Sequence, residues 1–512
     1  MRGRVFRRPV WVVAVAVVIG LAVADRGHGP ADEPTAAIPA APASATLDPD
    51  AQGSVWFCTE GTSMPGDFAD HSVVVANPTG EAVTAEVSVF PATAMGSVTP
   101  EAPPHTLAVP VPARSQAEVR LADVVVSRFT AAMVEIDSGS AVVEQRVQGP
   151  TGIDVTPCAG RSSENWHFAA GSTRRDARLL FTVFNPFPGR AVVSFTFSTD
   201  EGAREPQPLR GVLVPARSLV VVDATDLVPR YASVATTISS QAGRVVAGRL
   251  QVFDGTEGLE GLTAGSGIPD PRTLWVFPTG PATGEAVEHL VVYNPNDREA
   301  AVDVTVWWDA PEPGDDPLPI PVAVPAHQRV AVVMGDPGPY PLPSESVAYR
   351  PTTPRPEQSG FWAAVQATNG VPVVAERVSA SPAASTPAGV ATTAGMSASA
   401  TRYLIAANRA DGAEVAVAVV NPSPDSIARV TVSKVADGRT QPLAEMDARE
   451  VAPRGRLVVP VDRLTGGHAY GLLVEASQPV VVSRTLLVHH GTGMASGASV
   501  PFAPVPLDPA AL

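Results

Sequence analysis

The sequence is poor in cysteine, aromatic residues and lysine. Of 512 residues two are cysteines, 5% are aromatic, and Lys434 stands against 35 arginines. So few aromatic side chains leave little material for an exposed row of rings that would bind carbohydrate. Two cysteines that pair with each other would leave no thiol for nucleophilic catalysis.

Long helical stretches are also missing, because 53 prolines and 42 glycines interrupt the chain. Residues of these types favour many short strands joined by turns. The length exceeds what one hydrophobic core supports and predicts about three to five domains of about 100–150 residues. The formal net charge of −15 would repel a polyanion, so nucleic acid is not an expected partner.

Residues 1–24 carry an export signal. The basic start MRGRVFRRP precedes the apolar run 10–24, which leaves the N-terminus in the cytoplasm and sends the rest across the membrane. The run falls short of the ~20 residues of a comfortable span, so a signal peptide cleaved after Ala24 is the alternative to an anchor. The Ala/Pro-rich residues 25–50 predict a flexible linker, which favours the anchor because a tether needs a fixed base.

The two cysteines predict one disulfide. Cys58 and Cys158 are an even pair in a chain with an export signal. A metal site is the weaker alternative, because the two lie 100 residues apart without nearby histidine pairs.

A three-part pattern repeats four times. Asn-Pro follows an alternating strand at Asn77-Pro78, Asn185-Pro186, Asn294-Pro295 and Asn421-Pro422. The motif VPARS or a variant comes 30 to 35 residues later, at Pro112, Pro215, Pro325 and Pro453. A valine-rich run closes each copy, at Arg146, Arg249, Arg377 and Arg484. Three markers in one order predict four tandem modules.

Each module predicts short strands. Alternation places apolar residues on one face, as in Val83, Ala85, Val87 and Val89, and Asn-Pro starts the turn that follows a strand. About seven strands in ~108 residues favour an immunoglobulin-like β-sandwich over a barrel or paired propeller blades. The expected fold class is all-β, with modules at 51–160, 161–270, 271–398 and 399–512.

Two modules have distinguishing features. Modules begin at Trp56, Trp166, Trp275 and Tyr403, so the disulfide would tie the first strand of module 1 to its last. Module 3 contains a long Pro-rich loop at 335–360, and loops of this length are functional or disordered.

These motifs resemble a known family. The order of WHFAAG, WVFPTG, LVVYNP, VPARS and VPVVAER is similar to repeats of exported actinobacterial proteins of unknown function. The four copies cover about residues 55–500, and module 4 departs most because its opening lacks Trp. The resemblance implies an envelope location without known enzymatic activity, and it supplies no catalytic residues.

Candidate chemical groups are sparse. His489-His490 is the one adjacent histidine pair and lacks a third ligand at usable spacing. The acidic loops 254–261 and 309–317 do not match an EF-hand, and GMSAS (395–399) lacks the second glycine of a nucleophile elbow. We therefore expect no catalytic residue, no metal and no cofactor.

The repeated arginines allow two hypotheses. Arg146, Arg249, Arg377 and Arg484 would either form a row that binds an anionic envelope glycan, or pair with carboxylates or carbonyls of their own modules. Four copies at one topological position favour the second.

The sequence predicts a non-enzymatic, extracytoplasmic cell-envelope protein that binds or scaffolds through the loops of its modules. Expected partners are the membrane, through the N-terminal segment, and an envelope protein or glycan. One alternative is glycan binding through the outward-facing member of Trp307 and Trp308. The other is a hydrolase whose site lies in the loop 335–360.

Overall fold

The computed structural model describes residues 45–92, 103–278, 286–309, 317–334, 340–349, 360–406, 413–462, 470–488 and 493–509. The chain divides into Met1–Ala41 and one compact unit, Pro42–Leu512. The export signal (1–24) and linker residues 25–44 lie outside the described residues, so they stay predictions. The described end of the predicted flexible linker is instead fixed on module 4, because Leu47 is buried and forms a β-bridge with Phe502. No helix within the described ranges is both long enough and apolar enough to span a bilayer.

Module 1 contains two antiparallel sheets with the orders β1-β6-β3-β4 and β5-β2-β7-β8. Apolar side chains of both sheets, such as Val87 and Val143, meet in one hydrophobic cluster, as in a β-sandwich. The elements are β1 (Ser54–Cys58), β2 (Asp70–Asn77), β3 (Val83–Ala92), β4 (His105–Val111), β5 (Ser115–Arg120), the 3₁₀ helix η1 (Leu121–Asp123), β6 (Phe129–Ile136), β7 (Val142–Gly149) and β8 (Gly152–Pro157).

Strand β3 shows the predicted period of two. Val83, Ala85, Val87 and Val89 are buried, whereas Thr84 and Glu86 between them are exposed. The strand order is distinctive. An immunoglobulin domain places its first strand beside its second, but here β1 pairs with β6, and β2 lies between β5 and β7.

Module 2 has the sheets β12-β11-β15-β9, where β13 also pairs with β11, and β14-β10-β16-β17. Its elements are β9 (Asn165–Phe168), β10 (Ala177–Asn185), β11 (Ala191–Thr199), β12 (Gly202–Arg204), η2 (Gln207–Leu209), β13 (Val212–Val214), β14 (Ser218–Asp223), β15 (Ala235–Ala242), β16 (Val246–Asp254) and β17 (Glu260–Ser266).

Module 3 has the sheets β18-β24-β20-β21 and β23-β22-β19-β25-β26. Strand β23, inside the predicted loop 335–360, pairs in parallel with β22, so part of that loop belongs to the sheet. The strands are β18 (Leu274–Phe277), β19 (Val287–Tyr293), β20 (Ala300–Trp308), β21 (Ile320–Val324), β22 (Arg329–Met334), β23 (Ser346–Tyr349), β24 (Phe361–Ala367), β25 (Val374–Ser381) and β26 (Gly389–Ala394).

Module 4 is joined by one long strand, β33, which pairs with β27 and β29 along its first half and with β28 and β34 along its second. The strands are β27 (Ala398–Ile405), β28 (Ala413–Val420), β29 (Ala428–Ala436), β30 (Arg439–Pro442), β31 (Arg449–Val451), β32 (Arg456–Pro460), β33 (Gly471–Val488), β34 (Met494–Ala498), β35 (Val500–Pro501) and β36 (Val505–Pro506).

The marker asparagines connect two of the repeated motifs. Asn185 Nδ2 donates to the carbonyls of Gly189, Val214 and Pro215 at 2.7, 3.2 and 3.0 Å, and its Oδ1 accepts from Phe187 N–H. The same bonds recur at Asn77, Asn294 and Asn421. Each asparagine therefore holds the Asn-Pro turn against the VPA segment. In module 4 the accepting carbonyl belongs to Ala452, so Ala452 rather than Pro453 takes the marker position.

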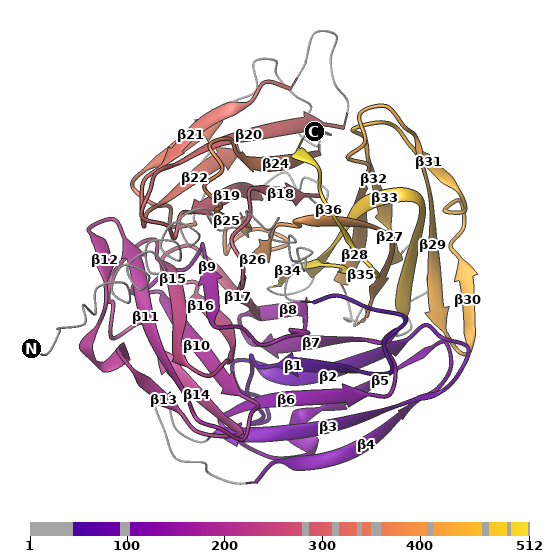
Figure 1. The fold of residues 1–512 in the computed structure, drawn as a ribbon, viewed down its shortest axis with the longest axis horizontal. Coiled ribbons are helices and arrows are strands. Elements are labelled where there is room, and N and C mark those ends of the chain that lie inside the picture. The colour runs from indigo at the N-terminus through magenta and orange to yellow at the C-terminus, as the bar shows by residue number, and fades with distance from the viewer. Residues whose placement is uncertain are drawn as a thin grey trace, which may run out of the picture. The chain divides into compact units, whose positions relative to one another are not determined.

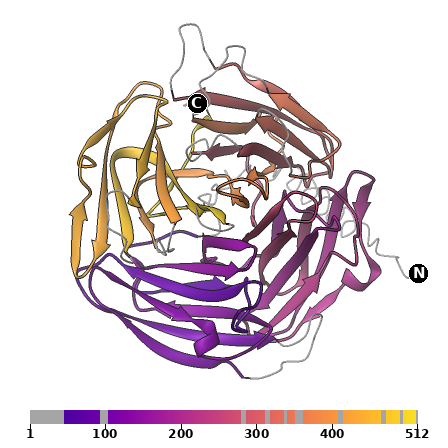
Figure 2. The ribbon, with the colours of Figure 1, turned by 180° about the vertical axis from the view of Figure 1, so that it is seen from behind.

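The modules of the compact unit form a closed circuit. Four edge strands, one from each module, form this circuit: β8, β17, β26 and β34 each contact the next, and β34 contacts β8 (Figure 1). The view from behind shows the same central strands enclosed by the four modules (Figure 2). The hydrophobic clusters also cross the module boundaries, since one contains Val87 of module 1 and Val417 of module 4. The interiors are thus shared between neighbours.

Candidate functional site at the module junctions

The strand register assigns equivalent positions in the four modules. The residue before each marker asparagine pairs with Val142, Val246, Val374 or Val481. Three positions later stand Gln145, Arg249, Arg377 and Arg484. Contrary to the prediction, Arg146 is therefore not equivalent to Arg249, Arg377 and Arg484. Val142 is the first residue of its valine pair but occupies the register position of Val246 and Val374, which are the second residues of theirs. Arg146 faces the opposite side of β7 and pairs with Glu118 near the surface.

Arg249 and Glu376 join module 2 to module 3. Arg249 Nη1 lies 3.0 Å from Glu376 Oε2 and Nη2 lies 3.2 Å from Oε1, and both side chains are 4% exposed. Glu376 also accepts from the Ala170 N–H at 2.7 Å, while Arg249 donates to the Ala170 carbonyl. Both charges are desolvated and hydrogen-bonded, an arrangement in which loss of one partner is costly.

Arg484 and Glu144 join module 4 to module 1 in the same way. Arg484 Nη1 donates to Glu144 Oε2 at 2.7 Å and to the Ala406 carbonyl at 2.8 Å, and Glu144 Oε1 accepts from Ala406 N–H at 3.0 Å. Arg484 Nη2 also donates to the Val155 carbonyl at 2.7 Å. The pair is almost fully buried although its members lie 340 residues apart. It links the last module to the first.

Arg377 forms its ion pair within its own module, as Arg146 does. It pairs with Glu288 of its own module, and the Ser379 hydroxyl donates to the same carboxylate at 2.8 Å. Burial by itself would raise the pKa of Glu288, but the Arg377 guanidinium outweighs burial and lowers it. Each of the four arginines thus bonds to a carboxylate or a carbonyl of its own module, as predicted. The prediction lacks the carboxylates of neighbouring modules, Glu376 for Arg249 and Glu144 for Arg484.

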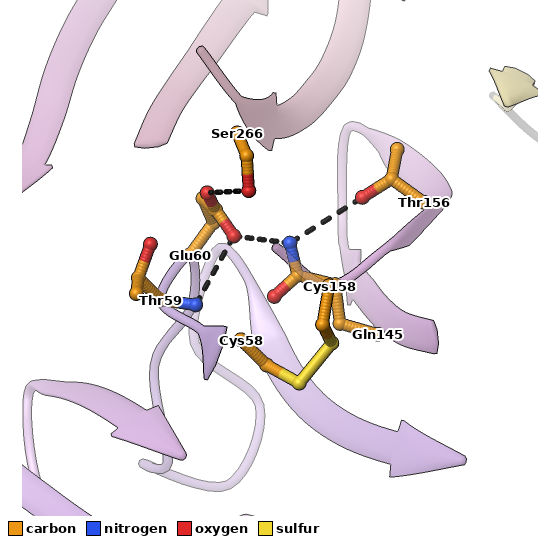
Figure 3. The surroundings of a disulfide bond; sticks show 7 residues. All are labelled: Cys58, Thr59, Glu60, Gln145, Thr156, Cys158 and Ser266. Carbon is orange, nitrogen blue, oxygen red and sulfur yellow. Dashed lines mark hydrogen bonds between the residues drawn. A yellow bond between two sulfur atoms is a disulfide. The ribbon is translucent and has the colours of Figure 1, made fainter. Parts of the chain in front are cut away.

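Module 1 has an amide where the others have a guanidinium (Figure 3). Gln145 Nε2 donates to the Glu60 carboxylate and to Thr156 Oγ1, and Glu60 also accepts from the Ser266 hydroxyl of module 2 at 3.4 Å. Burial raises the pKa of Glu60, although its hydrogen bonds favour the ionised form. Among the described residues Glu60 forms no ion pair.

A glycine explains why Glu60 stands at this junction. Gly248 of module 2 occupies the position that Glu144 and Glu376 hold in modules 1 and 3, and a Cβ there would lie 1.7 Å from Glu60 Oε1. Module 1 thus supplies the junction carboxylate from the loop after β1.

The predicted disulfide between Cys58 and Cys158 is present beside this junction, with the Cα atoms 4.7 Å apart (Figure 3). Cys58 ends β1 and Cys158 follows β8, so the bridge ties the first strand of module 1 to its last, as the sequence predicts. Both residues are fully buried.

Hydrogen bonds connect the central strands of modules 1, 2 and 3. Asp154 of β8 accepts from Thr263 Oγ1 at 3.0 Å and from Ala264 N–H at 2.7 Å, both in β17. Thr392 of β26 donates its N–H to Thr263 Oγ1 at 3.3 Å. Burial raises the pKa of Asp154 to about 7.

The remaining links complete the circuit. Thr393 Oγ1 of β26 donates to the Ser496 carbonyl of β34 at 2.5 Å. Arg484 of module 4 donates to the Val155 carbonyl of β8 in module 1. Hydrogen bonds therefore join each module to the next.

A cavity of about 70 Å³ lies among these strands, here called the axial cavity. Every module contributes to its wall, with small residues from the central strands and a few larger ones. The lining includes Thr156, Gly265, Thr393, Gly497, Ser499, Trp275, Arg249 and Glu376.

Other candidates from the sequence do not converge on a site. His489 and His490 lie outside the described residues. Asp254 of the first acidic loop accepts from Thr256, and Asp309 of the second pairs with Arg456. Within the part of the chain that the structure describes, no three His, Cys, Asp or Glu side chains are placed to hold a metal ion.

The tryptophan that the glycan-binding alternative requires to be exposed is buried. Trp307 is 8% exposed and stacks on Trp362, with ring centroids 3.9 Å apart and planes inclined by 6°. Trp362 donates its indole N–H to the Arg454 carbonyl of module 4, so the stacked pair packs at the boundary between modules 3 and 4.

Sequence reasoning identified the arginines but missed Glu144, Glu288 and Glu376, which pair with three of them, and Glu60, which accepts from Gln145. One sequence signal was available: glutamate at 144 and 376 alternates with Gly248 and Ser483 at equivalent positions. Modules 1 and 3 have the glutamate, and each glutamate pairs with an arginine of module 4 or module 2.

Residues 141–312 match a family described as "Family of unknown function (DUF5719)". The match covers the end of module 1, all of module 2 and the first part of module 3, and it agrees with the expected family of unknown function. No curated protein is significantly similar to the chain.

Proposed function

We propose that this is a non-enzymatic, extracytoplasmic cell-envelope protein that binds or scaffolds envelope components. Its four modules, variants of an immunoglobulin-like sandwich, would act as one rigid platform. The observation that carries the proposal is the Arg484–Glu144 pair, which joins the last module to the first. Together with Arg249–Glu376 it fixes the loops of different modules relative to one another, so that several loops can meet one partner.

The disulfide supports the location. A bridge between Cys58 and Cys158 forms and persists in an oxidising compartment and is rare in the cytosol. An N-terminal anchor would keep the platform at the membrane, whereas cleavage after Ala24 would release it.

Cell fractionation with mass spectrometry of the mature N-terminus and of the cysteine peptides tests this function. The proposal expects an exported protein with Cys58 and Cys158 linked, which captures an envelope protein or glycan from envelope extracts. A cytosolic protein with free thiols would overturn the location. Capture of no envelope component by the intact, oxidised protein would overturn the binding role.

A further inference from the structure

An open pocket, here called the surface pocket, lies on module 1 where β2 begins and β5 and β7 end. Its volume is about 480 Å³, against about 70 Å³ for the axial cavity. The pocket is accessible to solvent, because the side chains of Arg120, Asp70 and Arg146 are 44%, 21% and 20% exposed. The polar residues of its lining are Asp67, Asp70, Ser72, Arg120, Arg146 and Gln148.

Strand register brings two arginines to this pocket. Arg120 of β5 and Arg146 of β7 both pair with Ser72 of β2, which lies between them. Residues opposite one another in neighbouring strands point their side chains to the same face of the sheet. Arg146 therefore lines an open pocket, whereas the repeated arginines of the other three modules are buried.

The charges around the pocket are balanced. Arg120 Nε donates to Asp70 Oδ2 at 3.0 Å, and Arg146 pairs with Glu118. Asp67 adds another carboxylate to the wall. An anion would meet these carboxylates, and a cation would meet the two guanidinium groups. The pocket thus favours an uncharged occupant.

Two uncharged polar groups are available to such an occupant. Neither the Ser72 hydroxyl nor the exposed Gln148 amide makes a side-chain hydrogen bond to another described residue. A hydroxyl can donate and accept, and an amide does both through separate atoms. An occupant with several hydroxyl groups could bond to Gln148, donate to Asp70 and accept from Arg120.

The size and polarity of the wall agree with this chemistry. Ligand pockets usually measure roughly 300–1,000 Å³, so about 480 Å³ has room for a sugar residue. The rest of the lining is small, namely Gly66, Gly149 and Pro150. A polar occupant is favoured on every side, and without an aromatic platform in this lining we expect a Kd on the order of 1 mM.

We propose that the surface pocket binds a neutral, polyhydroxylated sugar unit of an envelope glycan. One hydroxyl would bridge Arg120 and Asp70, and a neighbouring hydroxyl would bond to Gln148. The proposal deepens the proposed binding function and rests on it for the source of the glycan.

Three variants separate the pocket from the rest of the surface. Arg120→Ala removes a guanidinium donor from the pocket, and Gln148→Ala removes an uncharged group while leaving both ion pairs intact. Arg429→Ala is the matched control, because Arg429 forms an exposed ion pair with Glu450 on module 4, outside the pocket. Thermal unfolding of each variant verifies its fold.

The measurement is saturation-transfer NMR on the full chain, titrated with glucose, galactose, mannose and arabinose as neutral probes. Glucuronate and glucosamine serve as the anionic and cationic comparisons. The expected result is saturation of at least one neutral sugar in wild type and Arg429→Ala. Binding should be about tenfold weaker in Arg120→Ala and in Gln148→Ala, and both charged sugars should bind more weakly than glucose.

Three outcomes would overturn the proposal: no saturation of any of the four neutral sugars, binding that Arg120→Ala and Gln148→Ala leave unchanged, or tighter binding of a charged sugar than of glucose. Capture of envelope components that is equal in wild type and Arg120→Ala would also contradict it. That last result would leave the proposed function standing, so the two failures are distinguishable.

Discussion

The ring of Phe168 lies over Gly267, so that a Cβ on Gly267 would come within 2.7 Å of Phe168 Cζ. Module 1 has Cys58 and Cys158 at these two positions. Backbone bridges establish the equivalence, because the residues just outside each pair bridge each other: Phe57 with Ala159, and His167 with Ile268.

Module 3 repeats the arrangement of module 2. Phe277 lies over Gly395 at 2.7 Å, beside the bridge between Val276 and Met396. A disulfide and an aromatic ring on glycine are therefore alternative ways to close one module.

Replacing the disulfide by the pair used in module 2 should preserve much of the stability. Cys58→Ala/Cys158→Ala should lower the free energy of unfolding by about 4 kcal/mol, because it releases a loop of 100 residues. Cys58→Phe/Cys158→Gly should lose less, since the ring refills the space. Denaturant unfolding of both variants checks this, and equal losses would contradict it.

The two kinds of junction should respond differently to loss of a carboxylate charge. Glu376→Gln leaves Arg249 charged and buried without its partner, and should cost about 3–5 kcal/mol. Glu60→Gln faces Gln145 rather than a guanidinium, and should change stability by about 1 kcal/mol or less. Denaturant unfolding compares the variants; the reverse ranking would show that the junction charges are misassigned.

The marker asparagine should tolerate no acidic replacement. In Asn185→Asp a carboxylate would face three carbonyls, whereas Asn185→Ala only leaves those carbonyls without a donor. We expect Asn185→Ala to cost about 2 kcal/mol and Asn185→Asp to cost more at neutral pH. Equal stability of wild type and Asn185→Asp in thermal unfolding would refute the role of this side chain.

Asp154 should make the fold less stable as pH rises. Its pKa is raised from 3.8 to about 7, so the folded protein holds this proton more tightly than the unfolded chain does. Protonated Asp154 therefore adds its full contribution to the free energy of unfolding below about pH 4. This contribution is lost as the pH rises towards about 7, at up to about 1.4 kcal/mol per pH unit.

His71 and His167 have the opposite effect, because burial lowers the pKa of each to about 4. The prediction thus concerns the difference between wild type and Asp154→Asn, measured as unfolding free energy from pH 4 to 8. The unfolding free energy of wild type minus that of Asp154→Asn should fall by several kcal/mol from pH 4 to pH 8. A difference independent of pH would mean that Asp154 stays ionised in the fold.

Local pattern was enough to predict the strands, the repeat and the disulfide. The period of two in β3 depends only on burial of one face, and the Asn-Pro and VPA motifs recur because Asn77 and its equivalents bond directly to the VPA carbonyls. Requirements of this kind act within one module, so they appear in the sequence as regular spacings between residues.

The junctions could not be derived in this way. Glu144 and Arg484 meet only because module 4 packs on module 1, and no local periodicity records a contact between residues so far apart. The one-residue shift of Arg146 follows from strand register, which a valine run leaves undefined. Trp307 is buried by stacking on Trp362 rather than by its own strand alternation.

The return of module 4 to module 1 is the central claim, and a cysteine pair tests it most directly. A Cβ on Gly471 of β33 lies 3.7 Å from the Cβ of Ala76 in β2, close to the ~3.8 Å typical of disulfides. Peptide mapping of oxidised Ala76→Cys/Gly471→Cys should find the two cysteines linked within one chain, and Ala76→Cys/Gly189→Cys should give no such link. A folded Ala76→Cys/Gly471→Cys protein with both new thiols free after oxidation would contradict the closed arrangement.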